Sequence, residues 1–215
     1  MLKQNKTKLL ITSIVILIPV VIGLLLWNQL PDKIVTHWNA EGVADGWSSK
    51  AFAVFAMPCF LLALHWLCLL ITNTDPKRKN YSERMFTMVV WICPITSVLM
   101  TSLVYGIALG MEISIEKVMP IFLGLMFIII GNYLPKCKQN YTLGIKIPWT
   151  LNDEENWNYT HRLTGKIWVV VGFVLMMCAM LPSKVIFLVF IVVLIVATVI
   201  PVICSYSFYK KKEKN

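Results

Sequence analysis

The chain has 215 residues, of which 58% are hydrophobic and 14% are charged, and its formal net charge is +9. This composition excludes an ordinary soluble domain, and apolar runs of about 18 or more residues indicate that most of the chain lies in lipid. A high positive charge can indicate nucleic-acid binding, but here the basic residues stand in short clusters beside the apolar runs. That arrangement is typical of topology signals and of attraction to anionic headgroups. We therefore expect membrane lipid as a partner and no direct nucleic-acid binding.

The first apolar run extends from Leu9 to Trp27, after three lysines. Such a beginning resembles a secretory signal peptide. The run is about 19 residues long, which is enough to span a bilayer, and residues 28–30 contain no small-residue cleavage site. We predict an uncleaved first transmembrane helix.

A polar and aromatic loop, residues 31–50, follows this span. Its residues 34–36 predict a short extended piece, and two glycines mark turns. Its two tryptophans suit the aromatic belt at a membrane surface. His37 and Asp45 are candidate metal ligands, but two ligands on a loop are weak support, and a hydrogen-bonded structural histidine is the stronger interpretation. We predict no metal site here.

Five further apolar segments are expected to span the membrane. They lie at about residues 51–72, 85–109, 118–133, 164–181 and 185–208. His65 is the only clearly intramembrane ionisable side chain, well away from the ends of its expected span. Intramembrane ionisable residues are functional candidates by default. We expect instead a neutral histidine bonded to a carbonyl of a neighbouring helix, and a functional role stays open.

The longest polar interruption of the chain is residues 131–166. Gly144 and Pro148 bracket a short extended piece, because the residue before a proline is disfavoured in a helix. Thr150 or Asn152 is expected to cap a new helix that has acidic residues in its first turn, where the helix dipole favours them. On that helix Trp157, His161 and Trp168 fall near one face, and Glu155 and Arg162 share another. Such a helix is expected to lie at the membrane surface before it enters the bilayer; an ordinary amphipathic linker is the alternative.

The order of residues in this stretch resembles the signature of the SdpI family, bacterial membrane proteins named for immunity to a secreted killing peptide, the sporulation-delaying toxin. The resemblance covers roughly 35 residues. Lys146 stands where many relatives carry arginine, which weakens the case for bidentate recognition of phosphate or carboxylate. The motif residues are Asn140, Gly144, Lys146, Pro148, Trp149, Thr150, Trp157, Thr160, His161, Arg162 and Gly165.

The loop at residues 31–50 also resembles the small loop that precedes the second span in many SdpI-type proteins. The resemblance rests on its proline, His-Trp pair, glycine, aspartate and lysine. We expect this loop to contact an external peptide. The candidate contact residues are His37, Trp38, Asn39, Gly42, Asp45 and Trp47.

The distribution of Lys and Arg predicts the topology. Sixteen of the 20 Lys and Arg residues fall on one side of the expected spans and four on the other. Loops rich in Lys and Arg stay in the cytoplasm. Both termini and residues 131–166 are therefore expected inside, and the loop at residues 31–50 outside.

The sequence offers little support for catalysis. The three histidines are scattered, and no zinc-protease, nucleophile-elbow or phosphate-loop pattern occurs. The six cysteines show no Cys-x-x-Cys pair, and we interpret them as small hydrophobic residues. We predict no enzyme activity and no catalytic, metal or cofactor site.

We predict an all-α bundle of six transmembrane helices in the cell membrane. Its expected divisions are residues 9–72, a first helix pair with the external loop; residues 85–134, a second pair; and residues 135–208, the cytoplasmic motif and a final pair. The resemblance implies immunity to a secreted membrane-active peptide toxin. In the family's founding role the membrane protein also signals by recruiting a small cytosolic repressor. The alternatives are a small transporter or channel, which the near absence of intramembrane charge disfavours, and a housekeeping membrane protein that shares the domain.

Overall fold

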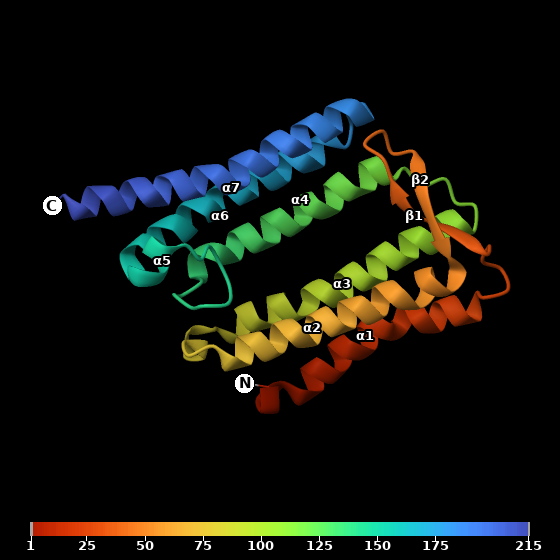
Figure 1. Cartoon of the computed structure of the whole chain (residues 1–215), viewed down its shortest axis with the longest axis horizontal. Coiled ribbons are helices and arrows are strands. Elements are labelled where there is room, and N and C mark those ends of the chain that lie inside the picture. Colours follow the sequence, from red (N-terminus) through yellow and green to blue (C-terminus); the bar gives the residue numbers. More distant parts are fainter. Residues whose placement is uncertain (1, 215) are drawn as a thin grey trace. The chain divides into compact units, whose positions relative to one another are not determined.

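The computed structural model describes residues 2–214. The chain divides into two compact units: the amino-terminal unit, residues 1–74 and 86–114, and the carboxyl-terminal unit, residues 75–85 and 115–215. Within the described residues, six helices are long and apolar enough to cross a membrane. Figure 1 shows the helices and a single pair of strands. The expected all-α, six-span fold is therefore confirmed, and the chain is a multi-pass membrane protein.

The amino-terminal unit contains three long helices. They are α1 (Lys6–Leu25), α2 (Met57–Thr74), which follows a π-helical turn at Phe52–Ala56, and most of α3 (Glu83–Ala108). Two hydrogen bonds join α3 to the backbone of α1: Ser97 Oγ donates to Ile16 O at 2.8 Å, and Tyr105 Oη donates to Pro19 O at 3.1 Å. These hydroxyl groups thus find acceptors on the neighbouring helix, in a part of the chain where lipid offers no hydrogen-bonding partner.

His65 lies inside the amino-terminal unit, buried against α1. Its Nε2 is 3.2 Å from Thr12 Oγ1, and the Thr12 hydroxyl donates to Leu9 O at 3.0 Å. Because the Thr12 proton is used in that bond, the imidazole Nε2–H is the donor to Thr12. The partner is thus a hydroxyl of the neighbouring helix, where a backbone carbonyl was expected.

The loop at residues 31–50 folds into a β-hairpin, with β1 at Lys33–Trp38 and β2 at Ala44–Ser49. The strands pair antiparallel, from Lys33 opposite Ser49 to Trp38 opposite Ala44, with an irregular register after Val35. The expected extended piece at residues 34–36 is confirmed. The second strand was not expected, because Asp and Gly are depleted in strands.

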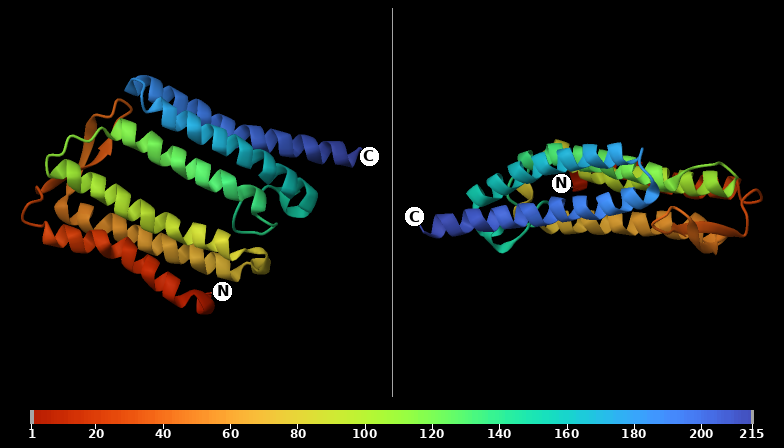
Figure 2. Two further views of the ribbon diagram at one scale, coloured as in Figure 1. Left: turned by 180° about the vertical axis from the view of Figure 1, so that it is seen from behind. Right: turned by 90° about the horizontal axis from the view of Figure 1, so that it is seen from above.

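The carboxyl-terminal unit contains three long helices and one short one. They are α4 (Ile115–Tyr133), α5 (Pro148–Asn152), α6 (Glu154–Cys178) and α7 (Ser183–Glu213). Figures 1 and 2 show α7 lying along α6, and α4 packs on the other side of α6. The turn between α6 and α7 is tight, which makes these two helices antiparallel neighbours.

Glycines bring α4 and α6 into close contact. A Cβ on Gly124 would stand 2.5 Å from Gly172 O, and a Cβ on Gly165 would stand 2.6 Å from Gly131 O. The glycines are seven residues apart on each helix, so they lie on one face. Small residues allow close approach of membrane helices, whose association relies on van der Waals contact. Gly165 of the motif therefore has a packing role.

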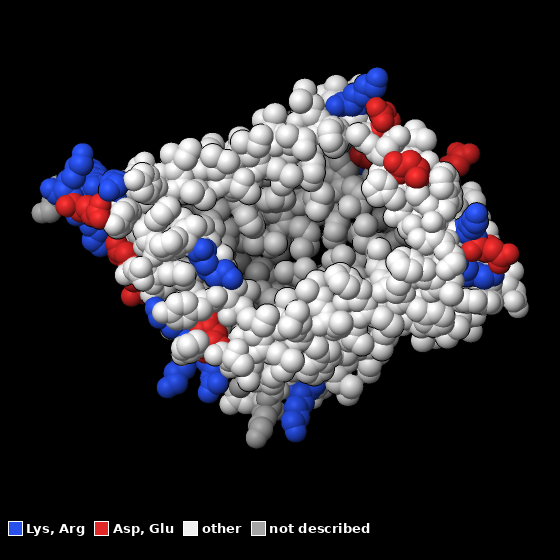
Figure 3. Space-filling view, viewed as in Figure 1, with Lys and Arg blue, Asp and Glu red and all other residues white. Residues whose placement is uncertain are grey.

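Most charged residues lie in the loops and toward the ends of the helices, although Lys166 is exposed near the middle of α6. Figure 3 shows the Lys and Arg residues gathered at the carboxyl end of α7 and in the loops, while the helix sides are white. These uncharged sides expose many large apolar residues, such as Val170, Phe173, Leu188 and Val192. Exposed apolar surface of this kind suits contact with lipid.

Candidate functional site

The centre of the candidate site is the buried carboxylate of Asp75, in the loop that precedes α3. Its Oδ2 accepts hydrogen bonds from Tyr81 Oη at 2.5 Å, Thr142 Oγ1 at 2.8 Å and Tyr141 N at 2.9 Å. Its Oδ1 accepts from Lys77 N at 2.7 Å. Asp75 therefore ties the loop at residues 75–85 to the segment after α4, which lies about 60 residues later in the chain.

These hydrogen bonds set the charge state of the carboxylate. Burial alone would raise the pKa of Asp75, but the side-chain donors Tyr81 and Thr142 and the two backbone donors together hold this pKa below its ordinary value. The pKa of Tyr81 lies well above its ordinary value. Burial is the larger cause, and the hydrogen bond that its hydroxyl donates to Asp75 is the second. Asp75 is thus a carboxylate and Tyr81 a neutral phenol at neutral pH.

Asn140, the first residue of the sequence motif, continues this network and is almost fully buried. Its Oδ1 accepts from Leu143 N at 2.6 Å and from Thr142 N at 2.9 Å, and it shares the single Tyr81 hydroxyl proton with Asp75, at 3.0 Å from Tyr81 Oη. Its Nδ2 donates to Lys138 O at 2.9 Å. The amide oxygen accepts hydrogen bonds and the amide nitrogen donates one. An asparagine suits this position because an ionised aspartate could not donate.

Gln139 connects the network to α5. Its Nε2 donates to Thr150 O and to Leu151 O, both at 2.9 Å, and its backbone carbonyl accepts from Asn80 Nδ2 at 2.6 Å. Lys77 Nζ donates to Gln139 Oε1. We call these residues the polar loop cluster. Its members are Asp75, Tyr81, Gln139, Asn140 and Thr142.

A second layer of the site is the stacked pair Trp157 and His161 on α6. Their ring centroids are 4.0 Å apart, and both side chains are buried. Trp157 Nε1 donates to Cys137 O at 2.7 Å. His161 Nδ1 lies 2.8 Å from Trp157 O, and His161 Nε2 accepts from Ile145 N at 3.0 Å. Since Nε2 accepts, the proton is on Nδ1 and the imidazole is neutral.

Gly144 makes this arrangement possible. Its φ is +105°, a conformation that favours glycine. The extended piece between Gly144 and Pro148 is held by Thr150, whose Oγ1 accepts from Ile147 N at 3.1 Å and lies 2.8 Å from Ile145 O. Ile147, the residue before Pro148, has the extended backbone that was expected there.

Hydrogen bonds between α6 and α7 hold the motif helix in place. Asn156 Nδ2 donates to Ser205 O at 3.0 Å, and Ser205 Oγ donates to Asn156 Oδ1 at 2.6 Å. Thr160 of the motif donates to the same Asn156 oxygen at 2.9 Å. Trp149 packs against Tyr206 and Tyr209 of α7, with centroids at 5.3 and 6.2 Å.

The cap of α6 differs from the predicted one: it is Asp153, whose side chain accepts from Glu155 N at 2.9 Å, rather than Thr150 or Asn152. The predicted aromatic face is not exposed, because Trp157 and His161 are covered by the segment after α4. On the other face, Glu155 forms a salt bridge with Lys212 of α7, at 3.0 Å.

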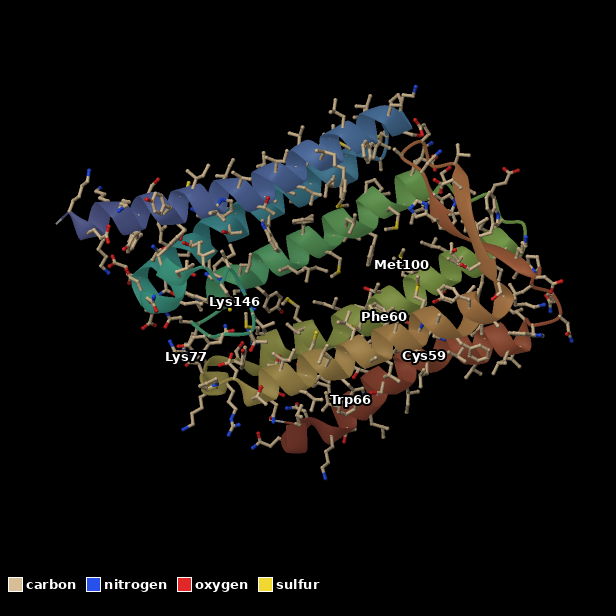
Figure 4. All side chains as sticks on the ribbon, viewed as in Figure 1. Cys59, Phe60, Trp66, Lys77, Met100 and Lys146 are labelled. Carbon is tan, nitrogen blue, oxygen red and sulfur yellow. The ribbon has the colours of Figure 1, made fainter. Side chains whose placement is uncertain are left out.

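The motif thus separates into a buried and an exposed set. The buried residues form the scaffold: Asn140, Thr150, Trp157, Thr160, His161 and Gly165. Gly144, Lys146, Pro148 and Arg162 are exposed, and Trp149 is half-buried. Figure 4 labels Lys77 and Lys146, which both belong to the loops of this unit. The exposed basic residues above a rigid scaffold can meet an acidic partner.

The hairpin is the second candidate site. Asn39 Oδ1 accepts from Val43 N at 2.9 Å and from Glu41 N at 3.0 Å, and Gly42 has a φ of +77°. His37 Nδ1 lies 2.6 Å from Asp45 Oδ1 across the two strands. The structure therefore brings together the predicted histidine and aspartate and gives the predicted glycine a turn conformation.

The hairpin is anchored on one side and open on the other. Lys50 Nζ donates to Trp27 O and Leu30 O, both at 3.1 Å, and lies 3.3 Å from Asp32 Oδ1. Ile34 is buried in the apolar core of the amino-terminal unit. Trp47 is 56% exposed, and Trp38 is half-buried. A ligand can therefore reach Trp47 more readily than Trp38.

Sequence reasoning missed Asp75, Tyr81 and Gln139. Asp75 stood in the sequence only as the first residue of a basic loop, next to a proline. Its one local signal is the Asp-Pro pair, which favours a turn. Among the described residues, no group of three or more His, Cys, Asp or Glu side chains could hold a metal ion.

Comparisons with known proteins fit this geometry. Residues 136–205 match the SdpI/YfhL protein family, and residues 14–62 match a domain of unknown function, DUF1648. The first match begins beside the polar loop cluster, and the second covers the hairpin. The chain is also 27% identical to the Immunity protein SdpI of Bacillus subtilis (strain 168) over 209 residues, which are 95% of this chain and 97% of that protein. No solved structure matches the chain. Over residues 136–205 the chain is therefore similar to the SdpI/YfhL family.

Proposed function

We propose that this protein confers immunity to a secreted, membrane-active peptide toxin, and that the hairpin is the face that contacts the peptide. The observation that carries the proposal is its similarity, along nearly the whole chain, to a protein named Immunity protein SdpI. The hairpin supports it physically. A membrane-active peptide first settles at the headgroup level, where an exposed tryptophan offers a large amphipathic surface.

Three features of the hairpin suit peptide binding. Its exposed residues include Trp47, His37 and Asp45, which supply an apolar surface and a hydrogen-bonding pair. The turn is ordered by Asn39, so little conformational entropy is lost on binding. Lys50 fixes the base of the hairpin to the end of α1. A rigid face with an exposed aromatic residue is typical of binding hot spots.

The test is survival of a toxin-sensitive bacterial strain that expresses the chain, treated with purified sporulation-delaying peptide. The expected result is growth with the native chain and killing with an empty vector. Trp47→Ala should reduce protection while membrane levels stay normal. Val43→Ala is the matched control, because Val43 is equally exposed on the same hairpin and is not aromatic. No protection by the native chain would contradict the proposal.

A finer part of the proposal concerns the motif. We infer that its exposed basic residues, Lys146 and Arg162, dock a small cytosolic repressor when the toxin is sensed. The charge distribution supports a cytoplasmic position for this surface, and the buried network beneath it gives a fixed geometry. A reporter controlled by a repressor encoded beside this gene would test the idea. Induction by toxin in the native strain and none in Arg162→Ala would support it; full induction in both would refute it.

A further inference from the structure

The carboxyl-terminal unit contains a hollow that the proposed function does not use. It lies between the first turns of α6 and the last turns of α7 and has a volume of about 580 Å³, which is within the range of small-ligand pockets. Its lining residues include Glu155, Tyr159, Ser207, Phe208, Lys211 and Lys212.

The two lysines of the hollow have different surroundings. Lys212 Nζ lies 2.9 Å from Asp153 Oδ2 and 3.0 Å from Glu155 Oε2, so its charge is balanced by two carboxylates. Lys211 is exposed and has no ion pair among residues 2–214. Lys211 is therefore the cation in this hollow that is available to an anionic ligand.

The opposite side of the hollow is apolar. Tyr159 and Phe208 stack with ring centroids 4.8 Å apart and close the wall between α6 and α7. Cys204 lines the hollow one turn before Phe208. Ile200, one turn farther toward the middle of α7 on the same face, is 40% exposed within the membrane-spanning segment. An acyl chain that left the hollow along α7 would meet this apolar side chain.

We propose that this hollow binds the headgroup of an anionic phospholipid from the leaflet that the carboxyl terminus faces. The phosphate lies beside Lys211 and the Ser207 hydroxyl, which are a cation and a hydrogen-bond donor. The glycerol and the first methylenes of the acyl chain lie against Phe208 and Tyr159. An acidic soluble peptide is a poorer occupant, because one wall of the hollow is apolar and adjoins the membrane-spanning part of α7.

The experiment measures lipid binding to the full chain, purified in detergent, by native mass spectrometry. Phosphatidylglycerol, phosphatidylcholine and water-soluble glycerol 3-phosphate are titrated separately. We expect tighter binding of phosphatidylglycerol than of the other two. Lys211→Gln should weaken it about fivefold, the change that corresponds to one lysine at an anionic lipid surface. Ser207→Trp, which fills the hollow without changing the charge, should weaken it at least as much.

The matched control is Lys184→Gln, which removes the same charge from the exposed opposite end of α7. An equal loss in Lys184→Gln and Lys211→Gln would overturn the site in favour of a general surface attraction. Equal binding of phosphatidylglycerol and phosphatidylcholine would contradict the proposed preference for an anionic headgroup. Equal binding of glycerol 3-phosphate would show a soluble phosphate ligand instead of a lipid. None of these outcomes depends on protection against a toxin.

Discussion

Gly144 lies so close to His161 that a Cβ atom on the glycine would stand 2.2 Å from the imidazole Nε2. That nitrogen accepts the backbone N–H of Ile145. The positive φ of Gly144 and the absence of a side chain there are therefore both needed to let the loop after α4 close over the stacked Trp157–His161 pair.

Gly144→Ala should lower the stability of the protein by at least about 1–3 kcal/mol, because a strained backbone and a steric clash are combined at one position. The measurement is the melting temperature in detergent. Gly110→Ala is the control: Gly110 has a φ of +89° with nothing within 4 Å of its Cβ position, so it reports the backbone strain alone. Equal losses in the two variants would show that contact with His161 is unimportant.

Asp75→Asn should destabilise the polar loop cluster by about 2 kcal/mol, because hydrogen bonds from several donors to a charged oxygen are lost. An amide nitrogen cannot accept the bonds that Oδ1 or Oδ2 accepts now. Asp32→Asn is the control, since the Asp32 side chain is 99% exposed beside Lys50. A melting temperature that is unchanged in Asp75→Asn would contradict the central role of this carboxylate.

The same carboxylate should make stability depend on pH. The folded-state pKa of Asp75 is lowered, so its contribution is present above its unfolded pKa, about 4, and is lost as the pH falls through the folded value. The melting-temperature difference between the native chain and Asp75→Asn should be constant at neutral pH and should shrink below about pH 4. A difference that grows in acid would reverse the sign and refute the assignment.

Arg162→Ala should leave stability within about 0.5 kcal/mol of the native chain, because Arg162 is exposed and Glu155 is paired with Lys212. If Arg162 docks a cytosolic partner, toxin-dependent reporter induction should fail while survival persists. Arg162→Lys keeps the charge and serves as the control. Full survival and full induction in a stable Arg162→Ala protein would leave the residue without the proposed role.

The topology prediction can be checked with single cysteines at exposed loop positions and a membrane-impermeant thiol reagent applied to whole cells. Val43→Cys, on the exposed hairpin, should react, and Asn152→Cys should react only after lysis. The chain with only its native cysteines supplies the background. Labelling of Asn152→Cys but not Val43→Cys from outside would invert the orientation and exchange the roles of the two loops.

Hydropathy and charge in the sequence alone determined the six spans and predicted their orientation. These properties are local: an apolar run of sufficient length must span the bilayer, and its flanking lysines favour one side. The motif residues were also recognisable from their order, but the positive φ of Gly144 is seen only in the structure. A helix with acidic residues in its first turn was also expected after Thr150 or Asn152, and α6 begins at Glu154.

Only the tertiary structure decided which residues hold the motif together. Asp75 accepts hydrogen bonds from Tyr141 and Thr142, and Glu155 forms a salt bridge with Lys212. The partners in each of these contacts are more than 50 residues apart in the sequence. Such contacts depend on how helices pack, and packing here follows from the close approach of α4 and α6 at Gly131 and Gly165. The distant partners of an aspartate beside a proline in a basic loop cannot be predicted from its local sequence, because the tertiary fold determines which donors lie near a buried polar group.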